Sequence, residues 1–230
     1  MCWQATALEH LMISIESLTV EAADPAAAKD FYAAAFGLED TVHVRTAQDE
    51  TEGFRWFSVS LVVAQPADVD GLVNRAIDAG ATTVKAPKKS FWGYGAVVRT
   101  PDGSMWKVVT QSKKDSGPAS DHIDDIVLLL GAADVRASKQ FYVDHGLKVS
   151  RSFGGKYAEF EAPPGRIKLA LYGRRGLARD TGVPPEGTGS HRIAVHSNAG
   201  AFTDPDGFVW EPTSGKSRVH DPEAAGIGES

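Results

Sequence analysis

Apolar and polar positions along the chain predict the same opening in both halves: a strand, a capped helix and then further strands. In the first half, Asp24-Pro25 supplies an N-cap followed by proline at the first helical position. Helical spacing then places Phe31, Tyr32 and Ala35 on one face before Gly37 ends the helix. The same patterns predict a second helix at 66–79 and strands at 12–21, 40–45, 54–64, 81–86, 96–99 and 105–110.

The second half repeats this order with similar residues. The segments Ala22-Ala23-Asp24, Phe31-Tyr32 and Gly37-Leu38 have counterparts in Ala132-Ala133-Asp134, Phe141-Tyr142 and Gly146-Leu147. Each half also ends in a Pro-Asp-Gly turn between two strands, at 101–103 and 205–207. We interpret this as an internal repeat; the alternative is two unrelated amphipathic helices.

The two halves differ in the middle. The second half has strands at 157–161 and 167–172 and a loop through Pro184-Pro185 to Gly189, and it lacks a counterpart of the helix at 66–79. The first half has that helix and lacks the hairpin. We therefore interpret each half as a trimmed form of one ancestral domain. The predicted boundaries are a first domain at 12–111, a polar linker at 112–121, a second domain at 122–213 and a flexible tail at 214–230.

Composition narrows the possible partners. The 230 residues suffice for two domains of about 110 residues each. A formal net charge of −6 argues against a nucleic-acid partner, and the single Cys2 excludes an intrachain disulfide. No apolar run approaches the roughly 20 residues of a membrane helix. The first eleven residues lack the features of a signal peptide, so we expect a cytoplasmic location with no membrane partner.

Four segments, in this order, resemble one family. They are Ala23-Asp24 through Phe31-Tyr32, Phe91-Trp92-Gly93-Tyr94, Leu169-Ala170-Leu171-Tyr172-Gly173 and Asp204 through Glu211. The pattern resembles the vicinal oxygen chelate superfamily of glyoxalases, bleomycin-resistance proteins and extradiol dioxygenases, and it covers residues 12–213. The resemblance implies an α+β fold in which βαβββ modules pair into curved mixed sheets around a cavity.

The resemblance also implies where a divalent metal would be held: by His from the first strand of a module and Glu from the last. In this chain those positions fall near Ser17 and Val127 for the first strands and at Lys107 for one of the last. One pair keeps the donor types, His191 near the His position and Glu211 at the Glu position. Strand alternation would let the two meet if both faces line the cavity. Two protein ligands make a poor catalytic metal site, so we expect no obligatory cofactor, with a divalent metal as the alternative.

Aromatic residues supply the candidate ligand contacts. Phe91, Trp92 and Tyr94 occupy a predicted glycine-flanked loop at 88–95, where core burial does not readily explain them. Tyr172, before Gly173, is a further candidate for the pocket.

The leading hypothesis is a protein that binds a small organic molecule in an aromatic-lined cavity without an obligatory metal. The alternative is a metal-dependent lyase, isomerase or dioxygenase that uses His191 and Glu211. Without a metal, Glu211 in an apolar cavity could act as an acid or base. A purely structural module is the third hypothesis. Whether the cavity forms within one chain or in a homodimer stays open.

Overall fold

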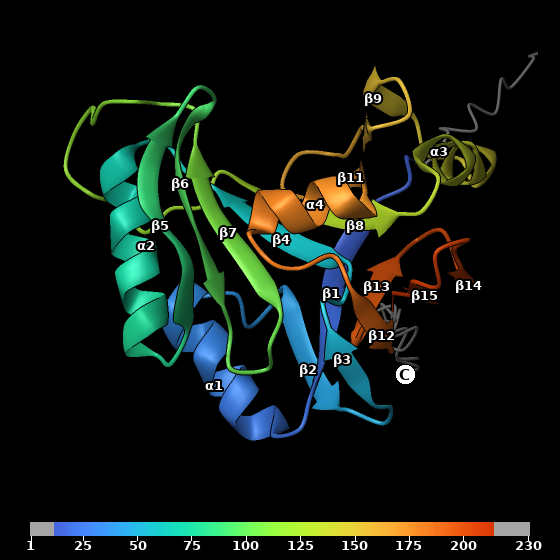
Figure 1. Cartoon of the computed structure of the whole chain (residues 1–230), viewed down its shortest axis with the longest axis horizontal. Coiled ribbons are helices and arrows are strands. Elements are labelled where there is room, and N and C mark those ends of the chain that lie inside the picture. Colours follow the sequence, from blue (N-terminus) through green and yellow to red (C-terminus); the bar gives the residue numbers. More distant parts are fainter. Residues whose placement is uncertain (1–11, 214–230) are drawn as a thin grey trace, which may run out of the picture.

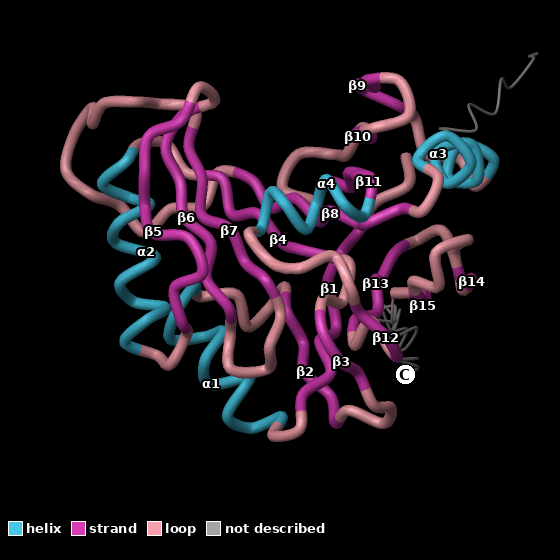
Figure 2. The backbone as a smooth tube through the Cα atoms, viewed as in Figure 1, coloured by secondary structure: helices cyan, strands magenta, loops and turns pink. Residues whose placement is uncertain are grey.

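The computed structural model describes residues 12–213 and has the α+β architecture expected from the sequence (Figures 1 and 2). Its four described helices are α1 (Pro25–Phe36), α2 (Pro66–Asp78), α3 (Val135–Asp144) and α4 (Arg174–Thr181). Among these residues no helix is long and apolar enough to cross a membrane. The predicted tail at 214–230 lies outside the described residues.

The first and third helices begin at the aspartates that the sequence pattern indicated. Asp24 accepts a hydrogen bond from the backbone N–H of Ala27, at 3.0 Å, and Asp134 accepts one from Arg136, at 2.9 Å. Both aspartates satisfy amides that would otherwise lack a partner in the first turn.

An eight-stranded sheet forms the largest layer and is assembled from two βαβββ units. Its order is β5-β6-β7-β4-β8-β11-β10-β9. Within each unit the first strand runs parallel to the last, β4 beside β7 and β8 beside β11, and β4 and β8 join the units antiparallel. The strands are β4 (Phe57–Val62), β5 (Thr82–Ser90), β6 (Gly93–Arg99), β7 (Met105–Thr110), β8 (Asp125–Ala132), β9 (Val149–Phe153), β10 (Tyr157–Phe160) and β11 (Lys168–Gly173).

A five-stranded sheet brings the two ends of the described chain together. Its order is β14-β15-β13-β1-β2, with β1 antiparallel to β13 (Figure 1). These elements are incomplete units, β1-α1-β2 from the first half and β13-β14-β15 from the second. The strands are β1 (Ile15–Ala22), β2 (Val42–Thr46), β13 (Ile193–Ser197), β14 (Phe202–Thr203) and β15 (Val209–Pro212), and β3 (Thr51–Gly53) pairs separately with β12 (Gly187–Gly189). Both large sheets thus contain strands from both halves, and the predicted domain boundaries stay a prediction.

Buried tyrosines hold both Pro-Asp-Gly turns to the core, the first through its own aspartate and the second through the aspartate that precedes the turn. The Tyr32 hydroxyl donates to Asp102, at 2.5 Å, and the Tyr142 hydroxyl donates to Asp204, at 2.6 Å. Trp106 and Trp210 are buried beside these tyrosines. The predicted internal repeat is consistent with this arrangement and stays a prediction.

Two elements differ from the sequence expectation. The predicted loop at 88–95 is a tight β5–β6 turn, because both strands continue to Ser90 and from Gly93. The segment after Gly173, expected to be a loop, begins with α4. Leu177 and Ala178 of this helix are buried in a small cluster with Leu129 and other side chains of the sheet.

The helices cover opposite faces of the eight-stranded sheet. We call the face that carries Met105 and Lys107 of β7 the inner face; Trp106 points to the opposite face, where α1 and α2 pack. On the inner face α4 contacts β4, β8 and β11 (Figure 1). The middle of the inner face is therefore filled by α4.

Candidate functional site

Two clefts lie on the inner face beside the last turn of α4. The first cleft, over β5, β6 and β7, has a volume of about 240 Å³, and the second, beside β11 and α4, about 650 Å³. Both are lined by Lys85 of β5 and Asp180 of α4. These two residues therefore form the shared wall between the two clefts.

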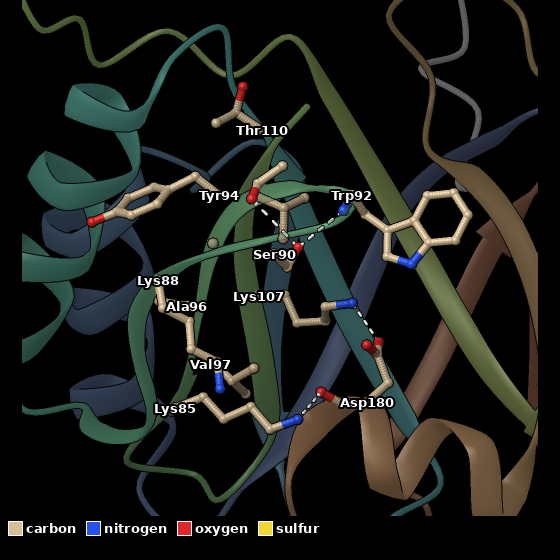
Figure 3. Close-up of a pocket in the computed structure, with 13 residues that line it drawn as sticks. Lys85, Lys88, Ser90, Trp92, Tyr94, Ala96, Val97, Lys107, Thr110 and Asp180 are labelled. Carbon is tan, nitrogen blue, oxygen red and sulfur yellow. Dashed lines mark hydrogen bonds and ion pairs between the residues drawn. The ribbon is translucent and has the colours of Figure 1, made fainter. Parts of the chain in front are cut away.

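An apolar floor and a charged wall make up the first cleft. Alternation along β6 and β7 presents Val97, Lys107 and Val109 to it. Lys107 forms an ion pair with the Asp180 carboxylate (Figure 3). Lys85 Nζ donates to the backbone carbonyls of Arg179 and Asp180, at 2.8 and 2.7 Å. Burial lowers the pKa of Lys85, as do the positive charges of Lys107 and Lys88, while Asp180 opposes the shift.

The β5–β6 turn positions Trp92 at the edge of the first cleft. Gly93 has a φ of 135°, and a Cβ there would stand 1.9 Å from the Thr110 carbonyl oxygen. Only glycine fits so tight a turn. Phe91 and Trp92 project from it, each 82% exposed, with their rings edge to face at 5.0 Å.

The structure places the three predicted aromatic contacts of this segment differently. Trp92 and Tyr94 are among the residues that line the first cleft, whereas Phe91 is not. The ring of Tyr94 points away from the cleft toward α2, where its hydroxyl donates to Asp70 at 2.8 Å (Figure 3). The alternation of β6 explains this direction, because Tyr94 and Val97 lie on opposite faces.

Tyr172 lines the second cleft, together with Lys156, Arg179 and backbone of Gly173. A Cβ at Gly176 would stand 2.5 Å from the Tyr172 ring, so glycine in α4 permits this close approach. Burial raises the pKa of the Tyr172 hydroxyl, and Asp180 adds to the shift.

His191 is engaged by the backbone. Its Nδ1 lies 3.0 Å from the Arg55 carbonyl oxygen, and its Nε2 lies 3.0 Å from the Asp206 carbonyl oxygen. Its ring stacks on Phe208 at 4.0 Å. Neither nitrogen faces Glu211, so the structure does not bring the predicted pair together.

Glu211 instead contacts Arg45 and His196. Parallel pairing of β13 with β15 sets His196 opposite Glu211, whereas His191 precedes the start of β13. The Glu211 carboxylate accepts a hydrogen bond from Arg45 at 2.7 Å and lies 3.8 Å from His196 Nε2. The guanidinium of Arg45 also contacts Glu21, at 2.9 Å.

His196 is a largely enclosed member of this polar cluster. Its Nε2 lies 2.7 Å from the Thr19 hydroxyl, and 16% of its side chain is exposed. Burial lowers the pKa of His196; the charge of Glu211 and a hydrogen bond with Pro212 oppose the shift. The positive charge of Arg45 adds to the lowering. The imidazole is therefore held in its neutral form near pH 7.

These residues do not fit the metal site that the resemblance implies. Between residues 12 and 213, no three His, Cys, Asp or Glu side chains converge as a metal site would require. The Arg45 guanidinium occupies one side of the Glu211 carboxylate, and a cation there would meet that positive charge. The expectation on cofactors stays a prediction.

Sequence reasoning missed most of the charged residues of the clefts. Lys85, Lys156, Arg179 and Asp180 belong to no recognisable motif, and only the fold brings them together. Lys107 is the exception, because it stands at the position where the resemblance implies a glutamate.

Comparison of sequences gives limited guidance. No family model matches the chain. The bifunctional protein GlmU of Lactobacillus gasseri and that of Lactobacillus johnsonii are each 26% identical to it over 139 residues, or 55% of this chain. The matched segment spans 29% of the length of these curated relatives.

Comparison of structures is more informative. Glyoxalase I from Zea mays superposes with a TM-score of 0.56 at 16% identity, over 86% of this chain and 91% of the maize protein. Two point mutants of the maize enzyme also superpose over 86% of this chain at 16% identity. One mutant gives a TM-score of 0.53 over 92% of its own length, and the other gives 0.52 over 91%. At this identity the likeness establishes the fold. The chain therefore has the glyoxalase-like fold that its sequence resemblance implies.

Proposed function

We propose that the protein binds a small organic molecule in the first cleft and requires no metal to do so. The observation that carries the proposal is the position of Trp92 beside an apolar floor formed by Val97 and Val109. An indole that is 82% exposed gains contact area when a planar ligand stacks on it. Ligand pockets commonly combine such apolar surface with a few polar groups, here Lys107 and Asp180.

Tyr172 extends the proposal to the second cleft. Because Lys85 and Asp180 line both clefts, a ligand longer than the first cleft would pass the end of α4 to reach Tyr172. The proposal thus keeps Trp92 and Tyr172 as ligand contacts. Phe91 is retained only as the neighbour that packs against Trp92.

The alternative, a metal-dependent lyase, isomerase or dioxygenase at His191 and Glu211, has less support. Each nitrogen of His191 faces a backbone carbonyl, and the Glu211 carboxylate faces Arg45. The ion pair with Arg45 accounts for the position of Glu211, and no specific observation favours a catalytic role for this residue.

A fluorescence titration with the neutral probe N-phenyl-1-naphthylamine tests the proposal. The probe should brighten on binding and accept energy from tryptophan, and Trp92→Ala should weaken binding about fivefold, the worth of one aromatic contact. Phe153→Ala is the matched control, because Phe153 is an exposed aromatic residue that lines neither cleft.

The same titration after dialysis against a chelator tests independence from metal. Unchanged binding supports the proposal. Binding that is lost on chelation and restored by a divalent ion would overturn it in favour of the alternative. Equal binding by Trp92→Ala and the unmodified protein would place the probe elsewhere.

A further inference from the structure

Positive charge is concentrated around the two clefts, although the chain as a whole has a formal net charge of −6. The cationic side chains that line the first cleft are Lys85, Lys88 and Lys107. Those that line the second cleft are Lys85, Lys156 and Arg179. Asp180 is the one carboxylate among the lining residues of either cleft. Five different cations therefore surround a single anion.

The ammonium groups are fixed by the fold. Lys107 projects from the middle of β7 with 15% of its side chain exposed, and its partner is the Asp180 carboxylate. The ammonium of Lys85 is held against the last carbonyls of α4, where the partial negative charge of a helix end favours a cation. Neither position depends on a bound ligand.

The cations also repel one another. The charges of Lys107 and Lys88 both act against the charged form of Lys85, and Asp180 is the carboxylate that opposes them. An anion that enters the first cleft would relieve this repulsion. Asp180 supplies part of that relief already and would compete with the anion for Lys107.

We propose that the ligand of the first cleft is an organic anion. Its carboxylate, sulfonate or phosphate group contacts Lys107 and Lys88, and its apolar body lies on Trp92 and Val97. Asp180 acts as an internal competitor that the anionic group displaces from Lys107. This inference rests on the proposed function and adds the chemical class of the ligand.

Two probes that differ by one sulfonate group test the inference. 8-Anilinonaphthalene-1-sulfonate carries the ring system of N-phenyl-1-naphthylamine and one added sulfonate. The anionic probe should bind more tightly, and its affinity should fall with added salt, because salt screens charges that solvent can reach. The neutral probe should bind equally at low and high salt.

Substitutions at the clefts locate the effect. Lys107→Gln should weaken the anionic probe about tenfold, the factor of one hydrogen bond to a charged group, and leave the neutral probe unchanged. Asp180→Asn should strengthen the anionic probe, since it removes the competing carboxylate. Lys29→Gln, an exposed lysine of α1, is the control and should change neither probe.

The outcomes separate the two proposals. If neither probe binds in a manner that depends on Trp92, the proposed function is wrong and the inference with it. If the neutral probe binds at Trp92 and Lys107→Gln leaves the anionic probe unchanged, the proposed function stands and the inference is overturned. An equal weakening of both probes by Lys107→Gln would also overturn it, because Lys107 would then act on the cleft without regard to the charge of the ligand.

Discussion

The surroundings of single residues depend on strand register. Glu211 meets His196 because β15 pairs with β13 in a register that sets the two opposite each other. Its partner Arg45 comes from β2, and β13 and β1 lie between β2 and β15 in the sheet. The sequence suggested that His191 would meet Glu211, because His191 was expected to start a strand and both residues are of the metal-binding types. Nothing in the sequence indicated that β13 begins two residues after His191.

The enclosed imidazole of His196 predicts a pH-dependent stability. Burial lowers its pKa below the ordinary value of 6.5, so the folded state favours the neutral form and the unfolded chain binds the proton more readily. The stabilisation is therefore complete above the unfolded pKa and is lost as the pH falls through the lower, folded pKa. We expect the urea midpoint to drop between about pH 7.5 and about pH 5.5, and His196→Gln to reduce that drop.

His122→Gln serves as the control for this measurement, because 77% of the His122 side chain is exposed. It should leave the pH dependence of the midpoint as it is in the unmodified protein. An identical pH dependence in His196→Gln and the unmodified protein would contradict the assignment.

At the scale of elements, the helices that the sequence predicted are those with clear end signals. Asp24, Asp134 and Pro66 mark three helix starts that the structure confirms. α4 went unrecognised because it is eight residues long and contains Gly176, which lowers helix propensity. What stabilises α4 is tertiary: Leu177 and Ala178 pack on side chains from other strands, which local sequence does not reveal.

Removal of the Leu177 side chain should therefore destabilise the protein. Leu177 has no exposed surface and packs in the cluster that contains Met105, Leu129 and Ala170. Leu177→Ala leaves a cavity there, and we expect a loss of about 2 to 4 kcal/mol in the free energy of unfolding, measured by urea denaturation. Arg175→Ala, an exposed position in the same helix, should change the free energy by less than about 0.5 kcal/mol. Equal losses in both variants would show that α4 is not anchored by this cluster.

At the scale of the whole molecule, the two halves of the chain are interleaved. β1 of the first half pairs with β13 of the second, and β4 pairs with β8 over six residue positions. One large core cluster contains Trp106 from the first half and Trp210 from the second. The sequence predicted two similar halves, and pattern alone did not reveal that each sheet would draw on both. Pairing between distant strands has no local sequence signature.

This interleaving predicts that the halves stay together when the chain between them is cut. The predicted linker at 112–121 runs along α2: Gln65 accepts a hydrogen bond from the Gly117 amide at 3.0 Å, and Asp68 accepts one from Ser120 at 2.7 Å. A protease site inserted after the exposed Lys113 should be cleavable in the folded protein. The two fragments should then elute together in gel filtration, because the β4–β8 and β1–β13 pairs and the shared core hold them.

In urea, the cut protein should unfold in one transition with coincident tryptophan fluorescence and circular dichroism curves. Two separate fragments under native conditions would mean that each half is an independent domain, and the clefts beside α4, which need Lys85 from one half and Asp180 from the other, would be lost.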